Sequence, residues 1–177
     1  MKKLMLLTAA IMIMAGFSTR IFAQDSEQTD AGAKIVSALS ITEVDDLHFG
    51  TMTIPTGAVE LELSTSTVRT PDVPANITLL SQAPVAQNAA YTVAGSANAT
   101  YAITLPADGV VEITSGANSM DVDDFVAKTA SAGIDGTTGT LDGSGADSFV
   151  VGATLKLANG QAAGVYTGTF NVSVDYN

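Results

Sequence analysis

The fold is decided by the C-terminal stretch Gly164–Val165–Tyr166–Thr167–Gly168–Thr169–Phe170–Asn171–Val172–Ser173–Val174–Asp175–Tyr176–Asn177. One parity carries Tyr166, Phe170, Val172, Val174 and Tyr176, and the other carries Thr167, Thr169, Asn171, Ser173 and Asp175. Because side chains on a strand alternate between its two faces, the stretch predicts a strand with one buried and one solvated face. Gly168 falls on the apolar parity, which indicates a bulge or a close approach of another backbone.

A long strand needs sheet partners, and the preceding segments supply them. Residues 33–41 predict a strand whose buried face carries Ile35, Ser37, Leu39 and Ile41. An acidic turn follows at residues 43–46. Val59, Leu61 and Leu63 then alternate with polar residues and predict the clearest short amphipathic strand.

The middle of the chain predicts more strands separated by turns. Residues 90–95 and 100–105 are expected to form a hairpin around the loop at 96–99, and residues 110–114, 120–128 and 149–157 read as further strands. A bulge near Asp124 would place Val122 and Phe125 on one face. The prolines in residues 65–88 favour an edge strand or irregular connection, and residues 131–148 predict a long exposed loop.

These elements define the fold class. Roughly ten short strands and no sustained helical stripe predict an all-β protein, specifically an antiparallel immunoglobulin-like β-sandwich.

The N-terminus predicts export. Lys2 and Lys3 precede an apolar run over residues 4–17 and a small residue, Ala23, before a polar segment, which is typical of a secretory signal peptide. We therefore divide the chain into a signal peptide (1–23), a flexible leader (24–32) and a single β-sandwich domain (33–177). The expected mature chain, residues 24–177, keeps four of seven basic residues against 18 acidic ones, a net charge near 4 − 18 = −14. Such a charge disfavours nucleic acid and anionic lipid as partners, and the absence of cysteine excludes a disulfide framework.

The sequence offers no catalytic, cofactor or metal site. His48 is the only histidine, no nucleophile elbow is present, and one histidine without cysteine cannot supply a zinc site. Carboxylates gather at Asp121, Asp123 and Asp124, and again at Asp135, Asp142 and Asp147. We interpret them as solvated acidic turns, with weak calcium binding at the second group as the alternative. No enzymatic activity is predicted.

A family resemblance is carried by five motifs in order: Leu47–Gly50, Tyr91–Gly95, Tyr101–Pro106, Val151–Leu155 and the terminal Gly164–Tyr176. Together they resemble a bacterial exported family known as a domain of unknown function (DUF4402-like), which is similar in turn to the spore-coat-protein-U and chaperone–usher pilin group. The resemblance spans residues 33–177. It implies an immunoglobulin-like sandwich at the cell surface or in a fimbria, and it brings no catalytic residues. Many pilins of that group carry a disulfide, which this chain cannot form.

The expected function is an exported structural or adhesive component of the bacterial envelope, with a fimbrial, pilin-like subunit as its most specific form. Its partners would be other envelope or fimbrial proteins, or further copies joined by strand addition, located in the periplasm, at the cell surface or outside the cell. The alternative is a monomeric secreted module that binds a glycan or a surface protein through residues 131–148. For the segment with Ile35 and Leu39, two hypotheses remain: a strand donated to a neighbour, or the first strand of its own sandwich. We favour the second.

Overall fold

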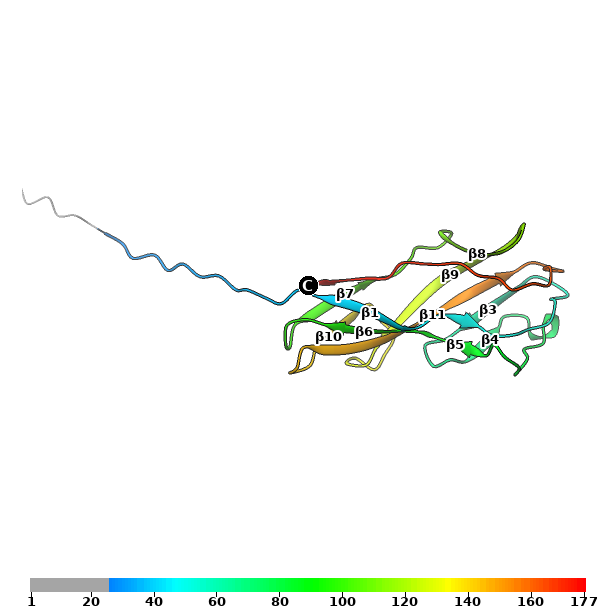
Figure 1. Cartoon of the computed structure of the whole chain (residues 1–177), viewed down its shortest axis with the longest axis horizontal. Coiled ribbons are helices and arrows are strands. Elements are labelled where there is room, and N and C mark those ends of the chain that lie inside the picture. Colours follow the sequence, from blue (N-terminus) through cyan, green and yellow to red (C-terminus); the bar gives the residue numbers. More distant parts are fainter. Residues whose placement is uncertain (1–25) are drawn as a thin grey trace, which may run out of the picture. The chain divides into compact units, whose positions relative to one another are not determined.

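The computed structural model describes residues 26–177, so the expected signal peptide lies outside the described residues. The chain divides into Met1–Lys34 and Ile35–Asn177, and the fold below is that of the second unit. Its elements are β1 (Ser40–Asp45), β2 (His48–Phe49), β3 (Val59–Leu63), β4 (Arg69–Pro71), the 3-10 helix η1 (Pro74–Asn76), β5 (Ala86–Gln87), β6 (Ala89–Ala94), β7 (Thr100–Thr104), β8 (Val111–Ser115), β9 (Asn118–Thr129), β10 (Thr138–Thr140), β11 (Ala146–Leu157) and β12 (Ser173–Tyr176) (Figure 1). No helix among these residues is long and apolar enough to cross a membrane.

The long strand β11 organises a seven-stranded sheet. One edge of β11 pairs with β9, which continues to β8. The other edge pairs first with β6 and then with β3. β1 extends the sheet beyond β6, and β4 extends it beyond β3. The side chains of β11 are buried along most of its length.

Two smaller sheets pack against the large one. The first has the order β10-β7-β12, and the second consists of β2 and β5. Apolar side chains of β6, β7, β9 and β11 form one core cluster, which includes the fully buried Tyr101. A second cluster is built around β3 and the ends of β8, β9 and β11. All pairings are antiparallel, so the all-β, antiparallel fold class is confirmed.

Two local predictions are confirmed in detail. In β3, Val59, Leu61 and Leu63 are buried while the two glutamates between them are exposed. In β9, the register against β11 shifts opposite Gly152–Thr154, and Asp124 takes a left-handed φ of 50°. This bulge lies where the sequence required it, and aspartate tolerates this conformation better than most residues. The proline-rich segment likewise supplies only short elements: the edge strand β4, the 3-10 helix η1 and the two-residue strand β5.

The prediction for the N-terminal strand is wrong in its limits. β1 begins at Ser40, and Ile35, expected in the core, is 96% exposed. The expected acidic turn at residues 43–46 is mostly the end of β1, which pairs with β6 through a bulge between Glu43 and Asp45. β1 lies at an edge of the sheet, where charged side chains reach water without cost.

The predicted hairpin over residues 90–105 is also wrong. β6 and β7 are adjacent in sequence, but β6 belongs to the large sheet and β7 to the sheet with β10 and β12. The connection at residues 95–99 is therefore a corner between layers. Strand periodicity describes the faces of each strand and carries no information on which sheet the strand joins.

Residues 131–148 are not one exposed loop. They contain β10, the buried Leu141 and the first residues of β11. Gly139 of β10 pairs with Tyr101 of β7, whose ring covers the glycine position. A short strand centred on glycine has little side-chain pattern by which to recognise it.

Candidate functional site

An open apolar groove lies between two extended stretches, residues 46–55 and residues 161–172, and has a volume of about 920 Å³. Its floor is formed by apolar side chains of β8, β9 and β11: Val111, Ile113, Met120, Val122, Leu155 and Leu157. Within the described residues, this floor belongs to the core cluster around β3, and five of its six side chains are buried while Ile113 is half-buried.

The first wall is paired along only one of its edges. Thr53 donates its N–H to the carbonyl of Thr78 (3.0 Å), and the carbonyl of Thr51 accepts from the N–H of Leu80 (2.9 Å). Met52 lies between them and makes no backbone hydrogen bond within residues 26–177. In an antiparallel pair, the residue between two such bonds directs its N–H and C=O to the opposite edge. The first wall therefore has an edge open to pairing.

The second wall is the stretch on which the fold was predicted. Thr167 exchanges two backbone hydrogen bonds with Thr114 of β8 (2.9 and 3.0 Å), which directs the backbone groups of its neighbours away from β8. A Cβ at Gly168 would lie 2.5 Å from the carbonyl oxygen of Glu112, which confirms the predicted close backbone approach. Residues 168–172 make no backbone–backbone hydrogen bond to any described residue.

The prediction of one continuous C-terminal strand is thus correct in its faces and wrong in its pairing. Tyr166, Phe170, Val172, Val174 and Tyr176 are all half-buried, and their polar neighbours on the other parity are all exposed. Only residues 173–176 form a ladder, with β7. The preceding part, drawn in red along β8 in Figure 1, is an extended segment with an unpartnered edge.

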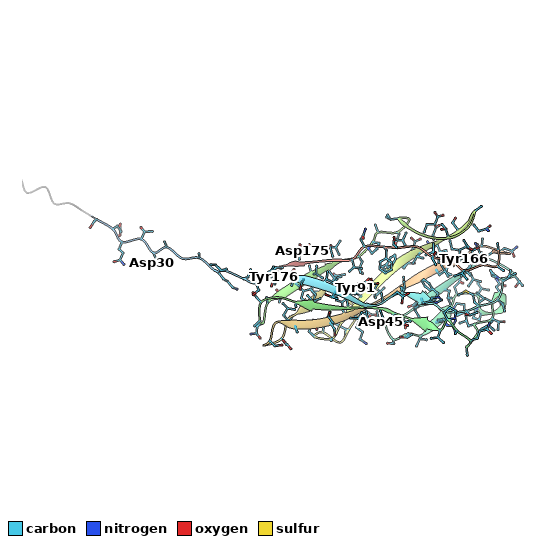
Figure 2. All side chains as sticks on the ribbon, in the orientation of Figure 1. Asp30, Asp45, Tyr91, Tyr166, Asp175 and Tyr176 are labelled. Carbon is cyan, nitrogen blue, oxygen red and sulfur yellow. The ribbon has the colours of Figure 1, made fainter. Side chains whose placement is uncertain are left out.

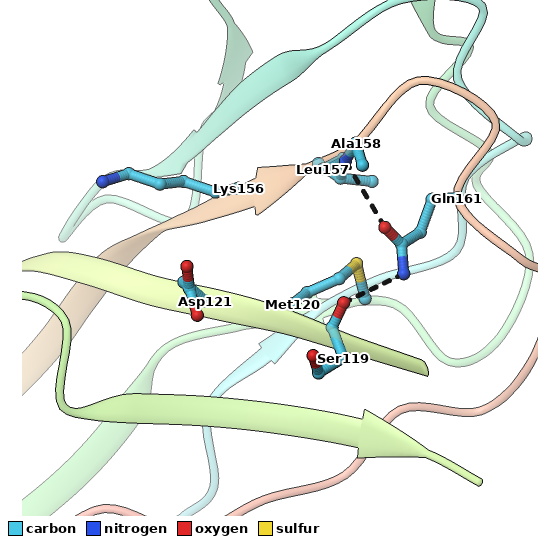
Figure 3. Close-up of a pocket in the computed structure, with 7 residues that line it drawn as sticks. All are labelled: Ser119, Met120, Asp121, Lys156, Leu157, Ala158 and Gln161. Carbon is cyan, nitrogen blue, oxygen red and sulfur yellow. Dashed lines mark hydrogen bonds between the residues drawn. The ribbon is translucent and has the colours of Figure 1, made fainter. Parts of the chain in front are cut away.

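Side chains hold this second wall in place. The rings of Phe170 and Phe125 lie 4.9 Å apart and join the segment to β9. Gln161 donates to the carbonyl of Ser119 (3.1 Å) and to the hydroxyl of Tyr166 (2.9 Å), and it accepts from the N–H of Ala158 (3.4 Å). Figure 3 shows the bonds of Gln161 to Ser119 and Ala158 in a small pocket of about 300 Å³ that shares Met120, Leu157 and Gln161 with the groove. The wall is therefore positioned by the fold, although its edge is unpaired.

The charged groups that line the groove are Glu43 and Asp46, with His48 beside them. The Nδ1 atom of His48 accepts from the N–H of Gly50 (2.8 Å), so the ring is oriented by its own turn. Burial raises the pKa of Tyr91 to about 12, and the charge of Glu43 adds to the effect. Tyr91, labelled in Figure 2, consequently contributes no charge to the groove at neutral pH. The rest of the lining mixes apolar side chains with polar ones such as Thr51 and Asn171.

His48 is half-buried and opens β2. The structure does not gather the carboxylates at residues 135–147 around a common point. Asp135 accepts from Thr65 (2.7 Å), and Asp147 accepts from Tyr101 (2.9 Å) and Ser131 (2.6 Å).

Asp142 turns back on its own loop and accepts from the N–H groups of Ala146 and Ser144, which lowers the pKa of its carboxyl. Asp123 faces Lys156 at 2.6 Å. That hydrogen bond, followed by one from the N–H of Gly109, lowers the pKa of Asp123. Among residues 26–177, no group of three or more His, Asp or Glu side chains is placed to hold a metal ion.

Sequence reasoning missed the groove. The parity of residues 166–176 identified the buried face of the second wall, but an unpaired edge is a property of the assembled sheets. The only local signal was Gly168, whose missing side chain brings the segment against β8.

The chain belongs to a family described as a domain of unknown function (DUF4402), whose model matches residues 39–176. The match includes both walls and the floor of the groove. Neither a curated protein nor a solved structure matches the chain.

Proposed function

We propose that the protein is an exported structural component of the bacterial envelope, a pilin-like subunit that assembles by accepting a β-strand. The observation that carries the proposal is the groove: an apolar floor between two strand edges with unpaired backbone groups. An edge of this kind is a template for pairing with another chain, and main-chain hydrogen bonds from an added strand supply affinity. The signal peptide that the sequence predicts over residues 1–23 and the resemblance to pilin-type proteins support the same reading.

The groove fits an extended peptide better than a compact small molecule. Its volume falls in the range of about 300–1,000 Å³ found for small-ligand sites. Its polar features, however, are mainly backbone edges that run along two stretches of about ten residues. A β-strand satisfies a row of backbone donors and acceptors, whereas a compact ligand reaches only a few of them.

The alternative function is a monomeric binding module that acts through residues 131–148. The structure of these residues offers it no specific support. The three carboxylates of this region accept hydrogen bonds from neighbouring side chains or from their own loop.

The proposal is tested on cells that express the full chain. We expect the recovered protein to begin at or near Gln24 by intact mass, to lie at the cell surface by immunogold electron microscopy, and to form oligomers in size-exclusion chromatography. A full-length, monomeric protein recovered from the cytoplasm would contradict it.

A further inference from the structure

We propose that His48 makes the first wall of the groove pH-sensitive: proton uptake by its Nδ1 atom breaks the hydrogen bond to Gly50 and releases the turn that positions the wall. This inference rests on the proposed function and deepens it by naming how the acceptance of a strand is regulated.

The first observation is that two side chains fix the wall at Gly50. Nδ1 of His48 accepts from the N–H of Gly50 (2.8 Å). Nη1 of Arg69, on β4, donates to the carbonyls of the residues on either side, Phe49 (3.3 Å) and Thr51 (3.1 Å). Three successive residues are therefore held by side chains, and the open edge of the wall follows directly after them.

The second observation is that the turn is tightly packed on one side. Gly50 has a left-handed φ of 79°. A Cβ at this position would lie 2.8 Å from Nη1 of Arg69 and 2.9 Å from the backbone N of Ala86 in β5. The turn therefore cannot move toward Arg69 and β5 when its contact with His48 is lost.

The third observation is chemical. A backbone N–H can be accepted only by a ring nitrogen that carries no proton, and in an imidazolium both nitrogens are donors. Histidine is the side chain that ordinarily changes its charge between pH 5 and pH 8. His48 is the only histidine of the chain. The hydrogen bond that holds Gly50 is therefore one that mild acid breaks.

The fourth observation concerns the charges around the ring. The titratable groups that line the groove with His48 are Glu43, Asp46, Tyr91 and Tyr166. Arg69 contacts the turn from the other side, and β5, which pairs with β2, carries no charge. The two carboxylates attract an imidazolium, whereas the guanidinium repels it from the turn. A protonated ring is therefore drawn toward the groove, where an added strand would lie.

The test compares two replacements of His48 in the mature chain, with circular dichroism confirming the fold of each. His48→Asn keeps an acceptor, because an asparagine side chain accepts from the backbone N–H two residues on, but it takes up no proton between pH 5 and pH 8. His48→Phe keeps a ring and removes the acceptor. NMR follows the Gly50 amide proton and the Met52 methyl group from pH 8 to pH 5, beside the ring signals of His48 in the natural chain.

In the natural chain, we expect the Gly50 and Met52 signals to shift with the same midpoint as the His48 ring. The protection of the Gly50 amide against exchange, relative to its intrinsic rate at each pH, should fall about tenfold. In His48→Asn both signals should keep their positions across this range. In His48→Phe both should differ from the natural signals already at pH 8 and shift no further. Signals that stay constant while the ring titrates, or that shift equally in His48→Asn, would overturn the inference.

The consequence for assembly is measured by size-exclusion chromatography at pH 8 and pH 5. The natural chain should need an about tenfold higher concentration to form oligomers at pH 5, because the released wall must be ordered again before a strand pairs with it. His48→Asn should assemble equally at both pH values.

The same measurements separate this inference from the proposed function. If the Gly50 and Met52 signals titrate with His48 but the chain never assembles, the turn is correctly identified as the pH-sensitive element and the proposed function fails. If the chain assembles at the cell surface and does so equally well at both pH values, the proposed function stands and only this inference fails.

Discussion

The hydroxyl of Tyr176 joins the two ends of the fold: it donates to the carbonyl oxygen of Ser37 (2.9 Å) and accepts from the N–H of Ser96 (2.7 Å). The last residue of β12 thereby fixes the point at which the N-terminal segment leaves the domain. In Figure 2, Tyr176 and Tyr166 lie at opposite ends of the C-terminal segment. This segment therefore both closes one end of the sandwich and forms one wall of the groove.

Replacing Tyr176 with phenylalanine should loosen this closure without disturbing the groove. The substitution removes two hydrogen bonds, worth about 1–2 kcal/mol together, from the free energy of unfolding in urea. The Ser96 amide should also exchange with deuterium faster. Tyr166→Phe, at the other end of the segment, is the control and should leave the exchange of Ser96 unchanged. Equal exchange of Ser96 in the Tyr176→Phe and natural proteins would contradict the closure.

Gly139 should tolerate no side chain. A Cβ at this position would lie 2.5 Å from the ring of Tyr101, which is fully buried and has no room to move. Gly139→Ala should lower the free energy of unfolding in urea by about 1–3 kcal/mol. The control is Gly143→Ala in the same region, where a Cβ would meet nothing within 4 Å; its effect should stay within about 0.5 kcal/mol. Similar losses for both variants would show that the Tyr101 ring is not the cause.

The fold and the site differ in how far the sequence predicts them. β3 was predicted correctly because Val59, Leu61 and Leu63 face the core while both intervening residues face water. The bulge at Asp124 was predicted because no regular strand places Val122 and Phe125 on one face. Both inferences use only side-chain periodicity, which a strand must obey locally.

Assignments that depend on partners were not accessible. The alternation of Ile35, Leu39 and Ile41 has the same form in a core strand and in an exposed extended segment, and only tertiary packing separates Ile35 from Leu39. The connection at residues 96–99 suits a hairpin as well as a corner between sheets. The groove exists because two edges remain unpaired, and the pairing of an edge is decided by elements far away in the sequence.

Asp123 should make stability sensitive to acid. Its pKa is lowered from 3.8 by Lys156 and by the N–H of Gly109. A carboxyl with a depressed folded-state pKa stabilises the fold above its unfolded-state pKa, and this stability is lost as the pH falls through the folded-state value. Asp123→Asn should lower the melting temperature at pH 7, and the difference from the natural protein should shrink between about pH 5 and pH 2.

The control for this prediction is Asp121→Asn, which removes the same charge from an exposed position on the same strand. Removing a negative charge from an acidic protein also relieves repulsion, and this control measures that effect. The difference in melting temperature between Asp121→Asn and the natural chain should stay nearly constant across the pH range. A pH-independent difference between Asp123→Asn and the natural protein would show that the ion pair with Lys156 does not titrate with folding.

Replacing Ile35 or Leu39 with aspartate should affect the stability of the monomer, measured at low concentration, very differently. Ile35 is almost fully exposed, so Ile35→Asp should leave the melting temperature by circular dichroism unchanged. Leu39 is half-buried against the core cluster around Tyr101, so Leu39→Asp should lower the free energy of unfolding by about 1–2 kcal/mol through lost apolar burial and a poorly solvated charge. Because the two residues share one parity, a complete first strand over residues 33–41 requires both variants to destabilise the monomer. Equal losses would restore that hypothesis.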